Sequence, residues 1–335
     1  MDRSTPRPAL AAVAHGQFGL FTRGDALAAG YSSAEIRARV GPRGAWRVVR
    51  RGVYIPARQW DDAISDDQWW WRDVAAHLQM TAEHVLSHDS AARGHGLPLL
   101  RQSVPLLHVT RPGVGGSRTR HGVKHHLGRE RPAVVVRRGG IGLTGLARTA
   151  LDLAREHGFS AGVVALDAAL RREATVRDVE MELARMTSWP FVMTARRAFA
   201  FADPAAESVG ESLTRILLAE LGLGPIETQF PVPVGDGVRW CDLRVGRHVF
   251  EFDGLVKYRS PADGGVASID PAEVAFRDRR RDTEIGEHGL GISHVVWEDL
   301  FAGRERAAAP APTRGSADST TLRHRPARAP GALRA

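Results

Sequence analysis

A short acidic hairpin is the part of the sequence best suited to chemistry. Residues 238–245 and 248–252 have the character of strands, and Gly246-Arg247 between them offers glycine where a type II′ turn needs a positive φ. In the register of such a turn, Asp242 lies directly across from Glu251, with the two β-carbons about 5 Å apart. Two facing carboxylates repel each other, so the sequence predicts a compensating cation beside them.

A divalent metal ion is the simplest compensating cation. Carboxylate oxygens on adjacent strands suit Mg²⁺ or Mn²⁺, which would polarise a phosphate group and lower the pKa of an attacking water. The alternative is that Arg244 or Lys257 neutralises the pair on a solvated hairpin. Strand alternation also predicts a carboxylate face and an opposite, mainly apolar face that covers a core. The first would carry Trp240, Asp242, Arg244, Val249, Glu251 and Asp253, and the second Cys241, Leu243, Val245, His248, Phe250 and Phe252.

The positive charge of the chain is concentrated at its two ends. The net charge is +8, and residues 1–60 contain ten Arg against three acidic residues, while residues 304–335 contain seven Arg against two. A small basic domain suits phosphate contact with counterion release, although Arg-rich surfaces also occur without a nucleic-acid partner. The tail after about Arg304 has hardly a large apolar side chain, so we expect it to be disordered.

Two short helices joined by a tight turn are predicted within the basic N-terminal block. Thr22 with Asp25, and Ser32 with Glu35, each match a capping box that opens a helix. Gly30 lies between them and suits the end of the first helix. This order of helix, tight turn and helix is typical of a helix-turn-helix.

A hairpin is predicted to follow the second helix, which we expect over about 34–40. Gly41-Pro42 ends that helix, and residues 46–50 and 53–55 then form a hairpin wing. The arginines of the second helix and the wing are the predicted DNA contacts: Arg37, Arg39, Arg43, Arg47, Arg50 and Arg51.

The middle of the chain is predicted to mix helices with short strands. Stretches such as 149–157 and 161–170 have helical periodicity, and 106–110 and 134–137 have strand character. We expect at least one of the three adjacent tryptophans at 69–71 to pack against another element. No histidine of this region has a metal-ligand spacing with Cys or a carboxylate, so we expect no metal site among them. They are His84, His88, His95, His108, His121, His125 and His126.

The sequence lacks the usual features of an exported or membrane protein. It has no run of eighteen apolar residues, and its start lacks the basic-then-apolar order of a secretory signal. A single cysteine, Cys241, allows no intramolecular disulfide and is expected to be a buried thiol. These features predict a cytoplasmic protein with no membrane partner.

Two stretches of the first 200 residues carry a resemblance to a known family. The run GLFTRGDALAAGYS from Gly19, continuing to RRGVY at 50–54, resembles the N-terminal domain of AbiEi-type antitoxins from type IV toxin-antitoxin systems. The runs LSHDSAA at 86–92, GLARTALD at 145–152 and LDAAL at 166–170 resemble that family's actinobacterial relatives. The resemblance implies a winged helix-turn-helix that binds DNA, often as an autorepressor, and it makes a cognate toxin a partner to test.

The C-terminal region, about 205–303, is similar to the restriction-endonuclease-like domain related to very-short-patch-repair endonucleases. The similarity is carried by Glu211-Ser212, Gln229, Asp242-Leu243, Glu251-Phe252-Asp253-Gly254, Lys257-Tyr258, the basic helix 273–288 and 295–300. In the PD-(D/E)xK motif of that superfamily, Asp242 matches the first carboxylate, Glu251 the second, and Glu211 the helical glutamate of some members. The lysine of the motif is replaced by Asp253. The cation must therefore come from Lys257 or from the basic helix, through Arg277, Arg279, Arg280 or Arg281, or be missing.

The sequence thus predicts an α+β multidomain protein. It would comprise a winged helix-turn-helix (1–60), an AbiEi-like mixed α/β region (61–200), a restriction-endonuclease-like α/β domain (205–303) and a disordered basic tail (304–335). One interpretation is an endonuclease on double-stranded DNA, in which Asp242, Glu251 and Glu211 hold Mg²⁺, Asp253 orients water and Lys257 stabilises the phosphate. The other is an antitoxin-like repressor whose nuclease fold is inactive and serves only for binding.

Overall fold

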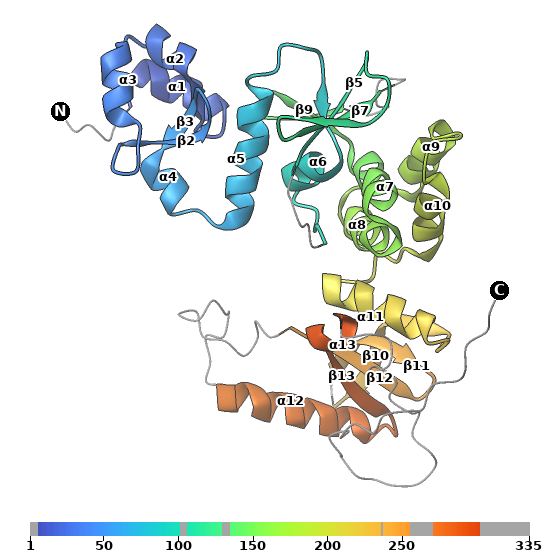
Figure 1. Cartoon of the computed structure of the whole chain (residues 1–335). Helices are drawn as coiled ribbons and strands as arrows, with labels where there is room; N and C mark the ends of the chain where they lie inside the picture. Colours follow the sequence, from blue (N-terminus) through green and yellow to red (C-terminus); the bar gives the residue numbers. More distant parts are fainter. Residues whose placement is uncertain (1–5, 101–105, 129–134, 236, 255–270, 302–335) are drawn as a thin grey trace. The chain divides into compact units, whose positions relative to one another are not determined.

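The computed structural model describes residues 6–100, 106–128, 135–235, 237–254 and 271–301, with only the backbone described for 271–278 and 301. Lys257 and the basic tail, both part of the predictions above, lie outside these residues. The chain divides into two compact units, Met1–Phe201 and Ala202–Ala335, and its architecture is mixed α and β as predicted (Figure 1). Among the described helices, none combines the length and apolarity needed to cross a membrane.

The first unit begins with short helices and a three-stranded sheet of order β1-β3-β2. Both predicted capping boxes are confirmed, at Thr22 with Asp25 and at Ser32 with Glu35. The buried Trp46 ring lies at the centre of the local core, with its centroid 4.8 Å from that of Phe21. The elements are α1 Pro8–Gly16, β1 Phe21–Thr22, α2 Arg23–Ala28, α3 Ser33–Arg39, β2 Trp46–Arg50, β3 Val53–Pro56 and α4 Ala57–Asp61.

The rest of the first unit is a six-stranded sheet with helices, of strand order β6-β7-β5-β4-β9-β8. Trp70 and Trp71 of α5 are buried in the core cluster that contains Val109 and Leu143 of the sheet, so the expected packing role of these tryptophans is confirmed. The strands are β4 Val85–Leu86, β5 Leu107–Arg111, β6 Arg118–Arg120, β7 Val123–Leu127, β8 Val135–Arg138 and β9 Ile141–Thr144. The helices are α5 Ser65–His77, α6 His88–His95, α7 Leu146–His157, α8 Phe159–Arg172, α9 Val176–Arg185 and α10 Val192–Phe201.

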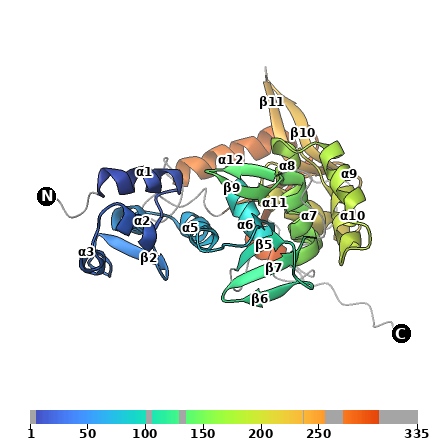
Figure 2. The ribbon, with the colours of Figure 1, turned by 90° about the horizontal axis from the view of Figure 1, so that it is seen from above.

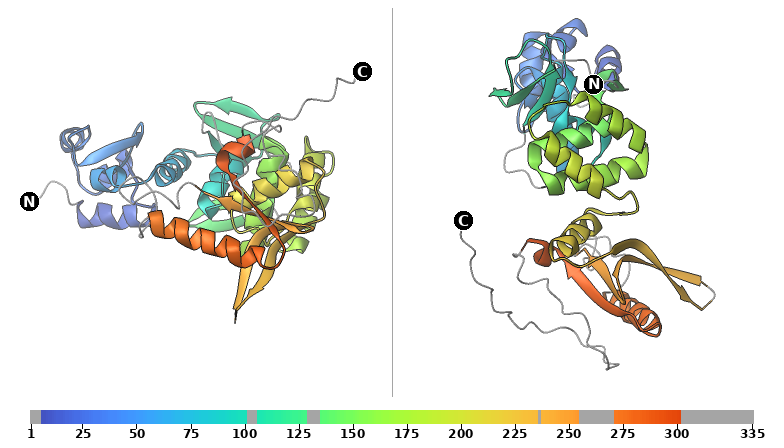
Figure 3. Two further views of the ribbon diagram at one scale, coloured as in Figure 1. Left: turned by 90° about the horizontal axis from the view of Figure 1, so that it is seen from below. Right: turned by 90° about the vertical axis from the view of Figure 1, so that its right-hand side faces the viewer.

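The second unit is a four-stranded sheet of order β10-β11-β12-β13 that lies between α11 and α12 (Figure 1). The outer part of the β10–β11 hairpin projects beyond the other strands (Figures 2 and 3). The elements are α11 Val209–Glu220, β10 Ile226–Val234, β11 Gly237–Val245, β12 His248–Asp253, α12 Pro271–Gly286, β13 Gly291–Val296 and α13 Trp297–Phe301.

The predicted hairpin register is confirmed for the strand pairs next to the turn, but one face assignment is wrong. Leu243 pairs with Phe250 and Val245 with His248, as the two-residue turn requires. Cys241, however, packs with Val249 toward α12, whereas Leu243 packs toward α11. The alternation is interrupted opposite Gln229, whose positive φ of 53° kinks β10. Both faces of the hairpin are therefore covered near Cys241 and Leu243, whereas Trp240, farther along β11, is 56% exposed.

Candidate functional site

Three acidic side chains of the second unit, two of them buried, come from three different elements. Glu211 comes from α11, Asp242 from β11 and Glu251 from β12. Both glutamates are buried, with relative exposures of 6% and 7%. Burial raises the pKa of each, and the negative charge of Asp242 raises the pKa of both further. Asp242 thus lies within electrostatic reach of both glutamates, but the carboxylate oxygens of the three predicted metal-binding residues do not all lie within 4.8 Å of one another. We call this set the acidic cluster.

Local hydrogen bonds fix the direction of two of these carboxylates. The Glu211 carboxylate accepts a 2.8 Å bond from the Glu207 backbone N–H and a 3.2 Å bond from Gln229 Nε2. Asp242 Oδ2 accepts the backbone N–H of Phe252 at 2.8 Å, so this side chain lies along the edge of β12. Asp242 and Glu251 are neighbours because of the hairpin register, but Asp242 bonds to the partner strand instead of simply facing Glu251.

Arg281 of α12 supplies a cation at Glu251. Its Nη2 donates to both carboxylate oxygens at 3.0 Å and to the backbone oxygen of Trp240 at 2.7 Å. The pKa of Glu251 is nevertheless raised to about 7, because burial and Asp242 together outweigh the effect of Arg281. Arg281 was one of four arginines predicted as a source of the missing positive charge. Arg244, predicted as an alternative neutraliser, pairs with Glu227 at 3.3 Å instead.

A histidine that the sequence analysis missed lies beside the acidic cluster. The Asp253 carboxylate and His294 Nδ1 are 2.7 Å apart, and His294 Nε2 lies 3.1 Å from Asp282 Oδ2. The hydrogen bond to Asp253 and the charges of both aspartates raise the pKa of His294 to about 9, so this ring carries a positive charge at neutral pH. His294 reaches the cluster because β13 pairs in parallel with β12, with His294 opposite Glu251. Only that long-range register could have revealed it.

The predicted DNA-contacting arginines of the first unit fall into two groups. Arg37, Arg43 and Arg51 have exposed side chains. The other three make contacts within the unit. Arg47 binds Asp61 and the backbone oxygens of Gly41 and Gly44, Arg50 binds Gln79 and the backbone oxygen of His121, and Arg39 lies over the rings of Tyr31 and Trp46. The first group is therefore better placed to meet phosphate groups than the second.

Comparison with known proteins gives limited similarity. No family model matches the chain. The chain is 28% identical over 173 residues to two uncharacterized proteins of Mycobacterium tuberculosis, one from strain CDC 1551 and one from strain H37Rv. The aligned segment is 50% of this chain and 59% of each relative, so the chain spans less than two thirds of their length.

Proposed function

We propose that this protein binds double-stranded DNA through residues 1–60 and hydrolyses phosphodiester bonds at the acidic cluster. The observation that carries the proposal is that Asp242 of β11 lies within electrostatic reach of two buried glutamates from other elements, Glu211 and Glu251. Holding like charges together in a buried position is unfavourable unless a cation offsets them. In this proposal the C-terminal unit is a restriction-endonuclease-like domain of the PD-(D/E)xK type, and the N-terminal helices and hairpin form a winged helix-turn-helix.

The chemistry of the acidic cluster fits Mg²⁺ or Mn²⁺. Its donors are carboxylate oxygens, the ligands that these hard cations prefer. Burial, and then the charge of Asp242, raise the pKa of Glu211 and of Glu251, so a bound cation would favour their charged forms. Asp242 and Glu251 would hold the ion, with Glu211 assisting. When bound, the ion would polarise a phosphate group and lower the pKa of a water molecule.

The neighbouring side chains complete the proposed site. The cation that the motif's lysine would supply is replaced by Arg281 and the protonated His294, which together place positive charge beside the acids. Positive charge fixed at this position stabilises the negative charge that develops on a phosphate during hydrolysis. The hydrogen bond from His294 holds the Asp253 carboxylate in place, where it would orient an attacking water.

The test of the catalytic part is cleavage of supercoiled plasmid by the full-length protein. Nicking is expected with Mg²⁺ or Mn²⁺ and not with EDTA. Asp242→Asn should abolish it, because the variant loses a charged ligand at the centre of the cluster. Glu227→Gln is the matched control, because Glu227 is an exposed carboxylate on the next strand, paired with Arg244. Cutting by Asp242→Asn at the parental rate would show the assignment to be wrong.

A second candidate function is an antitoxin-like repressor whose C-terminal unit only binds. The ion pair between Arg281 and Glu251 favours this alternative, because it already satisfies one of the proposed metal ligands. In that case the protein binds DNA and leaves plasmid intact with either metal ion. In that case, removal of the Arg281 charge by Arg281→Gln would not raise the affinity of the protein for Mg²⁺ or Mn²⁺.

The DNA-binding part is tested by a salt titration of binding. Removing one phosphate-contacting arginine should weaken binding and lower the slope of log affinity against log salt by about 1. We expect this for Arg37→Ala and Arg51→Ala. Arg58→Ala is the control, because Arg58 is an exposed arginine on α4, outside the second helix and the wing. Equal slopes for all three variants and the parent would exclude the proposed DNA-binding surface.

A further inference from the structure

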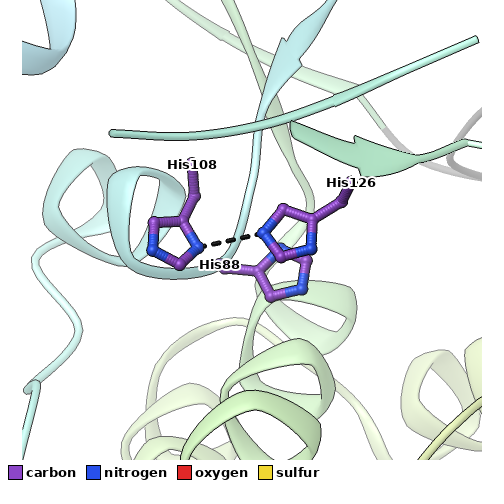
Figure 4. A group of neighbouring side chains, drawn as sticks. All are labelled: His88, His108 and His126. Carbon is purple, nitrogen blue, oxygen red and sulfur yellow. Dashed lines mark hydrogen bonds between the residues drawn. The ribbon is translucent and has the colours of Figure 1, made fainter. Parts of the chain in front are cut away.

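Three histidines that are far apart in the sequence meet inside the first unit (Figure 4). His88 begins α6, His108 lies on β5 and His126 on β7. One ring nitrogen of each lies within 4.8 Å of the others, and all three residues are buried. His108 Nδ1 is 3.1 Å from His126 Nε2, and the His88 and His126 rings are stacked with centroids 3.6 Å apart. We call this set the histidine cluster.

The fold of the sheet dictates this meeting. Strands β5 and β7 pair in parallel, with His108 opposite Lys124 and Thr110 opposite His126. Because side chains alternate along a strand, His108 and His126 share one face. The alternate residues Leu107, Val109 and Val123 of the two strands belong to the apolar core on the other side. His88 enters from the start of α6 with a φ of 47°, a left-handed conformation that is uncommon and strained for a residue with a side chain.

Carboxylates flank two of the three imidazole rings. His108 Nε2 lies 3.6 Å from Asp89 Oδ2, on the side of the ring away from His126. His88 Nε2 lies 3.8 Å from Asp152 Oδ1. Asp89 is held in turn by His157, at 2.6 Å. His108 thus has one nitrogen toward the other histidines and the other toward a carboxylate. This is usual for histidines that bind metal, because the carboxylate fixes the tautomer and raises the basicity of the ligand nitrogen. On His88 the second nitrogen, Nδ1, lies 3.0 Å from Ser87 Oγ.

The histidine cluster is uncharged at neutral pH. Burial lowers the pKa of His108 and of His126 to about 4, and lowers the pKa of His88 well below its ordinary value. Neutral imidazoles have a lone pair available for a metal ion. The 3.1 Å separation of His108 Nδ1 and His126 Nε2 is close to the roughly 3.3 Å expected between two nitrogens that share a tetrahedral zinc ion at 2.0–2.1 Å.

We propose that His88, His108 and His126 form a site for a divalent transition-metal ion of the kind represented by Zn²⁺. Imidazole nitrogen suits Zn²⁺ and its neighbours in the first transition series, whereas the all-oxygen acidic cluster suits Mg²⁺. A metal ion bound here links the start of α6 to two neighbouring strands, β5 and β7. Because it lies in the other unit and takes a different kind of ion, the site is independent of the proposed nuclease chemistry.

The experiment is metal loading of the full-length protein, freed of metal by a chelator and then given Zn²⁺ or Co²⁺. We expect about one Zn²⁺ per chain after dialysis, and visible absorption bands on Co²⁺ addition, which tetrahedral nitrogen coordination produces. His108→Asn and His126→Asn should abolish both. Asp89→Asn should lower the affinity by roughly 10- to 100-fold, because it removes a carboxylate that orients His108.

Two controls separate this site from others in the chain. His84→Asn should retain the metal, because His84 is not part of the histidine cluster and instead contacts His77, with 2.8 Å between their ring nitrogens. Asp242→Asn should also retain Zn²⁺ and Co²⁺ while it affects the acidic cluster. Absence of zinc and of cobalt bands in the unmodified protein would overturn the proposal, as would full retention by His108→Asn.

X-ray absorption by the unmodified protein loaded with Zn²⁺ tests the site without any variant, so its result does not depend on whether a variant folds. The zinc-edge X-ray absorption spectrum should show scattering from three imidazole rings. A coordination shell made of oxygen atoms alone would place the ion elsewhere and refute the site. A protein that takes up neither Zn²⁺ nor Co²⁺ and still has normal stability would show that the three rings form only a hydrogen-bonded polar core.

Discussion

Replacing Arg281 by glutamine should make the stability of the protein depend on pH in a defined direction. Glu251 is 7% exposed, and its pKa is raised from about 4.5 to about 7 even with Arg281 beside it. A raised pKa means that its contribution to stability is fully present below pH 4.5 and is lost as the pH rises to 7. Without Arg281 the pKa of Glu251 rises further, so in the variant the loss continues above pH 7.

The difference in free energy of unfolding between parent and Arg281→Gln should therefore widen above pH 7. This difference can grow by at most about 1.4 kcal/mol for each pH unit, and it stops growing above the pKa of Glu251 in the variant. The assay is urea unfolding with EDTA present at pH 6, 7, 8 and 9. Arg280→Gln is the matched control, because Arg280 is the adjacent residue on the same helix but pairs with Glu284 and is mostly exposed. A difference that stays constant or narrows with pH would refute the reasoning.

Three further perturbations have outcomes set by local contacts. His294→Gln should cost most stability at or below pH 6.5, and the deficit in urea unfolding should shrink as pH rises through about 9, because the raised pKa belongs to a ring stabilised in its charged form. Asp73→Asn should lower the free energy of unfolding by about 3–5 kcal/mol, because it leaves the Arg93 side chain, only 9% exposed, without its counter-charge at 2.6 Å. Gly210→Ala should cost about 1–3 kcal/mol, because a β-carbon there overlaps the Phe252 ring.

Each of these outcomes has a clear contrary result. A His294→Gln deficit that grows above pH 7 would contradict the charged state of the ring. Asp62→Asn is the control for Asp73, since it removes an exposed pair with Arg58 and should change stability by less than about 1 kcal/mol. Equal losses for the two aspartates would contradict the burial argument. An alanine at position 210 that leaves stability unchanged would mean that α11 and β12 can separate freely.

Features set by neighbouring residues could be predicted from the sequence. The capping boxes at Thr22 and Ser32 depend on a residue three positions later, and both are present. The two-residue turn at Gly246-Arg247 fixed the hairpin register, and with it the proximity of Asp242 and Glu251. The face of Cys241 could not be predicted in this way, because the kink that moves it lies on the neighbouring strand, at Gln229.

Features set by long-range pairing could not be predicted. His294 and Arg281 reach the acidic cluster only because β13 pairs in parallel with β12 and α12 covers that face of the sheet. The histidine cluster joins residues from α6, β5 and β7, so no spacing in the sequence indicates it. The expectation that these histidines form no metal site rested on spacing alone, and the parallel pairing of β5 with β7 removes that reason.

The reactivity of Cys241 reports local opening of the second unit. It is the sole cysteine of the chain, its side chain is buried against β12 and α12, and burial raises its pKa to about 12. A thiol reagent reacts with the thiolate, so modification in the native protein must wait for the sheet to open. The rate of alkylation therefore counts opening events beside the acidic cluster, with no label to introduce and no background from other thiols. Ligands that hold this region closed would lower the rate of alkylation of Cys241.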